Sequence, residues 1–311
     1  MVNGITIVGD GDNRVEVTSI GDTGYVLKSV DWDLPSVDIY TYQIPNKVGV
    51  SISGLTVGRR EPVITGYIYA NDIKHTARDT WEEYWASCQQ QIKAKKQMLD
   101  KIISPYNDVT LIVGDYVMEC RPKSYVKYGK EESNNNEVMC MFQITLLAYD
   151  AVFKKSGGKT TELAYTDGGF IFELVIPNDQ IVFGTIALNT LVTVENEGDN
   201  SVGCTIEIYA YEGNVEQPLI RNVVTGEYIK ILKTLSQGER IIIDTSAGEE
   251  SVTIVGSGGT EDGLKYLETG STFFQVVKGK SVYGFEASSG TASAATVTVN
   301  FDVQKVNIEE V

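Results

Sequence analysis

The chain has 311 residues, 42% of them apolar, which is enough to bury the cores of about two domains. It carries 26 basic and 42 acidic side chains, distributed unevenly: the net charge is −3 over residues 1–155 and −13 over residues 156–311. Phosphate binding needs a face rich in lysine and arginine, so this balance argues against sequence-specific nucleic-acid binding. No stretch approaches the length of a membrane span, so we expect no membrane insertion.

The first 70 residues predict short strands separated by Gly, Asn and Asp turns. The strand-like segments are residues 5–8, 15–19, 25–30, 37–42, 48–55 and 62–69. In the last segment both faces are apolar, which indicates a strand covered on both sides. Residues 10–13, Asp-Gly-Asp-Asn, resemble part of a calcium loop, but the remaining ligands are not in register. We therefore interpret them as a hairpin turn.

One long helix is predicted from about residue 73 to residue 104, where Pro105 ends it. The residues of its apolar face fall mostly three or four positions apart: Trp81, Trp85, Cys88, Ile92, Leu99 and Ile103. We expect the two tryptophans to be core anchors. Thr80 and Glu83 fit a capping box, so the regular helix could also begin there.

Two longer strands follow the helix, at residues 109–119 and 137–149, and the polar residues 123–136 between them predict a hairpin tip. Residues 154–159, Lys-Lys-Ser-Gly-Gly-Lys, predict a linker. The chain is thus divided into a strand-and-helix domain of residues 1–155 and a domain of residues 156–311.

The second domain shows strand patterns at short spacing and no helical period. The expected strands are residues 190–194, 205–211, 228–232, 240–244, 251–255, 272–277, 281–286 and 295–303. This spacing predicts an antiparallel β-sandwich. Residues 256–259, Gly-Ser-Gly-Gly, predict a flexible loop, because no Lys-Ser or Lys-Thr follows and no helix opens there as a phosphate loop requires.

The four cysteines, Cys88, Cys120, Cys140 and Cys204, show no C-x-x-C spacing, so a zinc site is not expected. Each lies within an apolar pattern and is interpreted as a small buried residue. Cys120 and Cys140 could face each other across a hairpin, which the sequence leaves open. The first residues lack the basic patch and apolar run of a signal peptide, so we expect synthesis in a reducing cytoplasm.

Catalytic chemistry finds little support in the sequence. His75 is the only histidine, and although Asp79 could share its helix face, no further metal ligand or nucleophile elbow accompanies it. The many carboxylates leave a glycosidase-like pair as an alternative. Sugar-cleaving clefts usually carry aromatic platforms, however, and the second half has no Trp and no His. We therefore predict a protein that is not an enzyme, with no catalytic, cofactor-binding or metal-binding residues and no cofactor.

The order of several motifs resembles the distal tail protein (Dit) family of long-tailed bacteriophages. In the first half the resemblance rests on residues 45–49, 58–66, 98–105 and 142–150. In the second half it rests on residues 194–199, 218–222, 225–227, 235–245, 273–274 and 278–279. The family usually places a proline and an aromatic residue after Asp150, whereas this chain keeps only the aromatic Phe153.

The resemblance implies a mainly β fold: an α+β belt domain that forms a ring, usually hexameric, followed by a galectin-like antiparallel β-sandwich. It implies a hub at the distal end of a phage tail that joins the tail tube to tail-tip, receptor-binding or other baseplate proteins. Such a protein belongs to the virion and is made in the bacterial cytoplasm, and its ring lets DNA pass through.

Two other functions compete with the hub. A carbohydrate-binding adhesin would contact the host cell wall through residues 160–311. A wall-degrading hydrolase would need a catalytic pair that the sequence does not single out. Fold alone does not fix activity, so a galectin-like sandwich does not by itself imply sugar binding.

Overall fold

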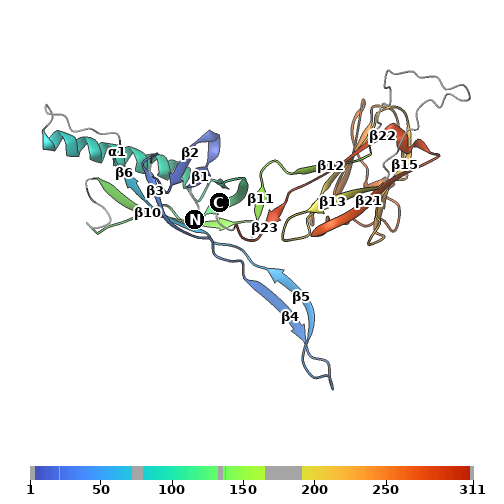
Figure 1. The fold of residues 1–311 in the computed structure, drawn as a ribbon, viewed down its shortest axis with the longest axis horizontal. Coiled ribbons are helices and arrows are strands. Elements are labelled where there is room, and N and C mark those ends of the chain that lie inside the picture. The colour runs from blue at the N-terminus through green and yellow to red at the C-terminus, as the bar shows by residue number, and fades with distance from the viewer. Residues whose placement is uncertain are drawn as a thin grey trace, which may run out of the picture. The chain divides into compact units, whose positions relative to one another are not determined.

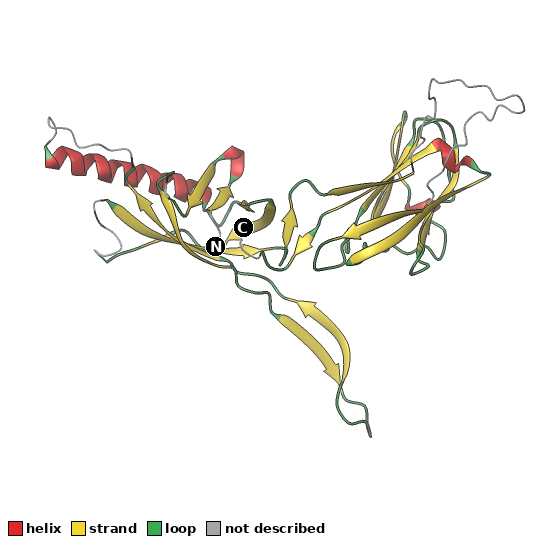
Figure 2. Ribbon diagram, in the orientation of Figure 1, coloured by secondary structure: helices red, strands yellow, loops and turns green. Residues whose placement is uncertain are grey.

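The computed structural model describes residues 4–20, 22–71, 80–131, 136, 138–164 and 191–308. Within them the protein is mainly β with one α-helix, as the sequence predicts (Figures 1 and 2). The chain forms two compact units, Met1–Ser156 together with Lys305–Val311, and Gly157–Gln304. The C-terminal segment thus returns to the first unit, a feature that a linear division of the chain does not contain.

The first unit is built on a ten-stranded sheet in the order β23-β11-β8-β7-β1-β2-β3-β6-β10-β9. β8 also pairs with β10, so seven of these strands form a closed sheet. The strands are β1 Gly4–Val8, β2 Arg14–Thr18, β3 Tyr25–Asp31, β6 Val63–Tyr69, β7 Val109–Val113, β8 Tyr116–Pro122, β9 Lys127–Tyr128, β10 Met139–Ala148, β11 Phe153–Lys155 and β23 Gln304–Lys305.

The interior of this sheet follows the two-residue period of a strand. Every second residue of β10 is buried, from Cys140 to Ala148. β6 has buried residues on both faces, among them Ile64, Thr65 and Gly66. This confirms the prediction that the strand is covered on both sides. Residues 109–119, predicted as one strand, are instead the β7–β8 hairpin, because Gly114 adopts φ +57° and turns the chain.

The helix α1 spans Trp81–Ile102 and lies against this sheet (Figure 1). Thr80 and Glu83 form the predicted capping box, so α1 begins at Trp81. The residues before Thr80 that were expected to be helical lie outside the described part of the chain. Two tyrosine hydroxyls bind backbone carbonyls of α1: Tyr25 Oη is 3.0 Å from Lys95 O and Tyr128 Oη is 3.2 Å from Lys96 O.

The predicted apolar face of α1 is only partly buried. Cys88, Ile92 and Leu99 are at most 5% exposed, whereas Trp81 is 62% exposed. The Trp81 and Trp85 rings stack at 6.1 Å between centroids. The prediction that Trp81 anchors the core is therefore wrong, because burial along α1 begins only at Cys88.

The second unit is an antiparallel sandwich, as predicted. Its six-stranded sheet has the order β12-β22-β14-β18-β19-β20 and its five-stranded sheet the order β13-β21-β15-β16, with β17 paired to β15. The strands are β12 Lys159–Ala164, β13 Leu191–Asn196, β14 Thr205–Ala210, β15 Val215–Asn222, β16 Tyr228–Lys230, β17 Thr234–Leu235, β18 Arg240–Asp244, β19 Ser251–Gly256, β20 Gly259–Asp262, β21 Gly279–Ser288 and β22 Ala295–Phe301. Short 3-10 helices are η1 Asp10–Asp12 in the first unit and η2 Leu264–Tyr266 and η3 Thr291–Ala294 in the second.

The core between the two sheets consists of alternate residues, such as Ile206 and Ile208 of β14 and Tyr283 and Phe285 of β21. Two local predictions differ from the structure. Residues 272–277 form no strand, and Val276 makes only an isolated bridge to Val202. Residues 256–259, predicted as a flexible loop, are the tight turn of the β19–β20 hairpin, with Gly256 paired to Gly259.

An ion cluster around Glu261 ties β20 to the neighbouring segments of the second unit. Its carboxylate accepts hydrogen bonds from Lys233 Nζ at 2.7 Å and Tyr266 Oη at 3.0 Å, and it forms an ion pair with Lys265 Nζ at 2.6 Å. The bond from Lys233, then those from Lys265 and Tyr266, lower the pKa of Glu261 from 4.5 to about 2.

We expect Glu261→Gln to lower the melting temperature of the second unit at neutral pH. A depressed carboxylate pKa contributes stability above pH 4.5 that is lost as the pH falls toward 2. The difference between wild type and variant should therefore shrink across that interval in calorimetric melts. Glu249→Gln, at an exposed turn residue, is the control. A difference that stays constant from pH 7 to pH 2 would contradict this assignment.

Candidate assembly surface

A two-stranded ribbon projects from the first unit and is called the arm here, residues 36–58 (Figure 1). It consists of β4 Val37–Tyr42 and β5 Ser51–Val57, which pair only with each other. At its tip Lys47 N donates to Ile44 O at 3.1 Å, and Asn46 and Gly49 adopt φ +64° and +93°. These conformations suit asparagine and glycine, so the tip sequence turns the chain between the two strands.

One face of the arm is aliphatic. The register pairs Val37 with Val57 and Ile39 with Leu55, and Ile52 follows opposite Thr41 beyond a bulge. Because directly opposed residues share a face, Val37, Ile39, Ile52, Leu55 and Val57 form one continuous surface, the aliphatic face. Their exposed fractions run from 53% to 67%. The other face carries Asp38, Tyr40, Tyr42, Ser51 and Thr56, so it combines polar groups with two exposed tyrosine rings.

This surface is what sequence reasoning missed. Residues 37–42 were predicted as a strand, and apolar residues that alternate along a strand normally mark a face that the same chain covers. Here no described residue of the chain buries the five aliphatic side chains. Contiguous exposed apolar patches of several hundred Å² mark interaction sites, so the arm is the strongest candidate for a contact surface.

The arm joins the body at a buried arginine. Arg60 is 0% exposed, and its guanidinium donates from Nε to Asp33 O at 2.7 Å, from Nη1 to Ala151 O at 3.4 Å and from Nη2 to Val306 O at 2.8 Å. It lies over the Phe153 ring at 5.1 Å. The pKa of Arg60 is lowered, because the effect of burial is larger than the opposing effect of the nearby Asp33 carboxylate.

A sequence signal for this burial exists in hindsight. Arg60 and Pro62 precede β6 in the same alternating phase as Ile64 and Ile68, and all four are buried. The neighbouring Arg59 is out of phase, its side chain is 69% exposed, and it pairs with Glu61 at 3.0 Å. Extending the strand period backward from β6 would have separated the two arginines.

The candidate residues for chemistry lie partly outside the described chain. His75 and Asp79 lie outside the described residues. Residues 10–13 form the η1 turn between β1 and β2, where Asn13 Nδ2 donates to Asp10 O at 2.6 Å. The described residues hold no group of three or more His, Cys, Asp or Glu arranged to bind a metal ion. In the same part of the chain, no helix combines the length and apolarity needed to cross a membrane.

All four cysteines are free and buried. Cys120 lies opposite Ala148 and Cys140 opposite Ile68, so the two cysteines do not face each other. Burial raises the pKa of Cys120 to about 12 and that of Cys204 to about 11. We expect the folded protein to react very slowly with Ellman's reagent at pH 8, because all four thiols are buried and out of reach of the reagent. After unfolding in guanidinium, four thiols per chain should react. Fast reaction of the folded protein would contradict the buried arrangement.

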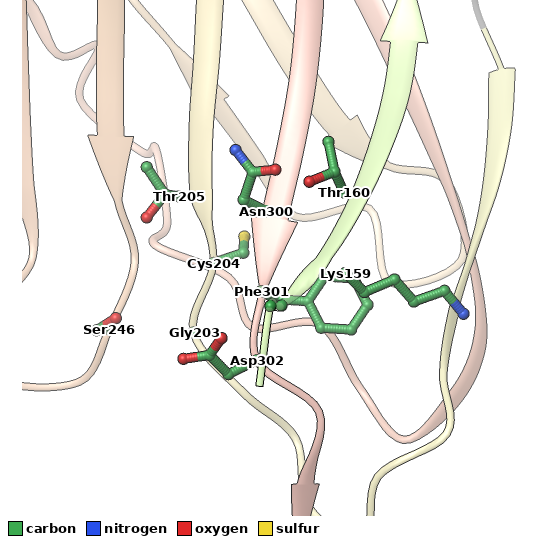
Figure 3. Close-up of a pocket in the computed structure, with 11 residues that line it drawn as sticks. Lys159, Thr160, Gly203, Cys204, Thr205, Ser246, Asn300, Phe301 and Asp302 are labelled. Carbon is green, nitrogen blue, oxygen red and sulfur yellow. The ribbon is translucent and has the colours of Figure 1, made fainter. Parts of the chain in front are cut away.

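The second unit contains a polar cavity of 430 Å³ at one end of the sandwich (Figure 3). Side chains of Thr160, Thr205 and Asn300 line it, and Figure 3 shows Lys159 directed away from them. Lys159 Nζ instead donates to Glu195 O at 2.7 Å. The aromatic residue of the lining, Phe301, is only 4% exposed. The cavity thus offers hydrogen bonds but no open aromatic platform on which a sugar could stack.

Part of the second unit is similar to a known protein family. Residues 197–304 match the family model described as siphovirus-type tail component, C-terminal domain. Nothing among the curated proteins matches the chain. Residues 197–304 are therefore similar to siphovirus-type tail components, which confirms the resemblance predicted from the sequence.

Solved structures extend the likeness to the whole fold. The chain matches the SPP1 Dit protein, described as a paradigm of the hub adsorption apparatus in phages infecting Gram-positive bacteria, with a TM-score of 0.60 and 12% identity. That match covers 96% of this chain and 98% of the other. A chain of the phage P2 baseplate in its activated conformation with Ca matches with a TM-score of 0.41 and 10% identity, covering 97% and 98%.

Proposed function

From the tail-component domain in residues 197–304 and the hub-protein fold of the whole chain, we propose that this protein is a structural subunit of a phage tail hub. The single observation that carries the proposal is the aliphatic face of the arm. A projecting ribbon with five exposed aliphatic residues needs a covering surface in its working state. A subunit whose task is assembly supplies such a surface on another molecule.

The partner of the arm is a second copy of the chain. The arm projects from one side of its own unit, and its docking site on the neighbour would be a surface other than the arm. Such a heterologous contact, repeated around an axis, closes a ring. The resemblance to distal tail proteins implies six copies around the tail channel. The first 155 residues have a net charge of only −3, which suits a channel through which DNA slides without binding.

The second unit would face the other tail components. Residues 156–311 carry a net charge of −13, which keeps the protein soluble before assembly and favours basic or polar partners. Its galectin-like sandwich would support tail-tip, receptor-binding or other baseplate proteins, while the ring joins the tail tube. The protein would be made in the bacterial cytoplasm and end in the virion.

No bond-making step is needed for this role. Four described carboxylates have a clearly lowered pKa, and each pairs with a nearby cation: Glu61 with Lys123, Asp108 with Arg121, Glu261 with Lys233 and Glu268 with Lys230. In these four pairs the lowered pKa comes from an ion pair, which stabilises structure and does not prepare a carboxylate for proton transfer. The hub therefore acts by contact and position alone.

The proposal is tested by measuring the mass of the purified protein and by imaging tails. A ring, or incorporation at the distal end of tail particles, is the expected result. Deleting arm residues 37–57 should leave the second unit folded and abolish the ring. A strict monomer that never enters tails would overturn the proposal.

The second candidate function is glycan binding, at the polar cavity of the second unit. Hydroxyl and amide groups such as Thr205 and Asn300 can hydrogen-bond a sugar, although no open aromatic ring accompanies them. Retention of the full chain on purified cell walls, lost in Asn300→Ala, would favour it. Equal retention of both proteins would assign the cavity no such role.

A further inference from the structure

We propose that Arg60 sets the direction in which the arm leaves the first unit, and so acts as a positioning residue for docking onto the neighbouring copy. This inference rests on the proposed function, because the arm must meet a partner for its direction to matter. It is carried by the position of Arg60 at the base of the arm and by its contacts to three separate segments.

The arm has no sheet contact that could hold its direction. β4 and β5 form their own two-stranded sheet, separate from the ten-stranded sheet of the body. An isolated two-stranded ribbon is joined to a body only through its two connections, here residues 32–36 and 58–62. Gly58 N donates to Ser36 O at 2.6 Å and closes the ribbon at its base. The direction of the arm therefore depends on how these two connections are fixed.

Arg60 fixes the incoming connection. Its Nε donates to Asp33 O at 2.7 Å, and Asp33 has φ +46°, a left-handed conformation that is unusual outside glycine. Two further bonds hold Asp33: Glu61 N donates to Asp33 Oδ2 at 3.1 Å, and Asp33 N donates to Asp31 Oδ1 at 3.1 Å. Arg60 and Glu61 of the outgoing connection thus hold the turn at Asp33, where the arm starts.

The same guanidinium reaches two other segments of the first unit. Nη1 binds Ala151 O, just before β11, and Nη2 binds Val306 O, just after β23. These segments lead toward the second unit and back from it. The main chain of Arg60 also pairs with β10, since Ala148 N donates to Arg60 O at 2.9 Å. The Arg60 side chain therefore links the base of the arm to the segments next to β11 and β23.

The choice of arginine follows from geometry. A planar fork with donors on three nitrogens can bind three carbonyl oxygens in different directions, whereas a lysine ammonium is a point charge on a flexible stem. A buried cation with carbonyl partners gives little net stability, and buried polar groups of this kind are often kept because they select one conformation. Selecting one arm direction is such a role.

The test measures the distance from the arm tip to the body by double electron–electron resonance. Spin labels are placed at Val48→Cys, fully exposed at the tip, and at Arg14→Cys, exposed on β2. The four native cysteines are at most 2% exposed and escape labelling. All proteins carry Leu55→Lys, so that docking onto a neighbour does not hold the arm.

We expect a narrow distance distribution with Arg60 present and loss of that narrow peak in Arg60→Met. Arg59→Met is the matched control and should keep the narrow peak, because the Arg59 side chain is exposed and pairs with the Glu61 carboxylate. If Arg60→Met does not fold, Arg60→Lys decides, and it should also broaden the distribution. An unchanged distribution in a folded Arg60 variant would overturn the inference.

The result is independent of whether the ring forms. If the proposed function is wrong, the wild-type protein forms no ring, or the variant without arm residues 37–57 still forms one. A failed positioning role would appear as an arm that keeps its direction without Arg60. The two outcomes come from different measurements and cannot be confused.

Discussion

A single lysine at position 55 is expected to prevent self-assembly of the protein while leaving each chain folded. Leu55 lies in the middle of the aliphatic face and is 63% exposed in the single chain, so Leu55→Lys meets no clash there. In a ring the new ammonium would be buried without a partner, which costs several kcal/mol. We expect the dissociation constant of the copies to rise at least about 100-fold, or about 2.8 kcal/mol. Sedimentation velocity over a concentration series measures this.

The neighbouring residue supplies the control. Thr56 lies on the other face of the same strand, opposite Asp38, so Thr56→Lys adds the same charge where the surface is already polar. Its dissociation constant should stay close to that of the wild type. If both variants assemble equally well, the aliphatic face is not the contact surface. If both fail, the effect comes from charge on the arm and not from the face.

The arm shows why a correct strand prediction did not yield the site. The period of residues 37–42 is that of a half-buried strand, and this much could be read from the sequence. The period says that one face will be covered, but not whether the cover belongs to the same chain. Only the coordinates show that the five aliphatic residues remain open within the described chain. Assembly surfaces and internal cores have the same sequence pattern.

Other elements were predictable to the extent that local chemistry decides them. The capping box at Thr80 fixes the start of α1, and alternation along β14 and β22 gives the sandwich. The exposure of Trp81 was not predictable, because the helical period of apolar residues continues to Trp81 although burial along α1 begins only at Cys88. The role of Arg60 depends on Ala151 and Val306, which lie far away in sequence. Such long-range partners leave no local trace.

Two motifs behind the family resemblance meet in the closed sheet, and this meeting gives the second large effect. Gly66 of β6 lies directly opposite Phe142 of β10. A Cβ at Gly66 would lie 2.5 Å from Val26 O and 2.6 Å from Phe142 Cζ. Phe142 is 0% exposed, and Val26 belongs to β3, which pairs with β6, so neither neighbour has room to move. The sheet therefore requires glycine at this position.

We expect Gly66→Ala to destabilise the first unit by about 3 kcal/mol, the upper range for overpacking a core. The three tryptophans, Trp32, Trp81 and Trp85, all lie in the first unit, so their fluorescence during urea unfolding follows that unit alone. Gly54→Ala is the control: Gly54 lies in β5 of the arm, and a Cβ there meets nothing within 4 Å. Its effect should stay within about 0.5 kcal/mol. Equal unfolding midpoints for the two variants would mean that β3 and Phe142 can shift, and that the glycine serves some purpose other than close packing.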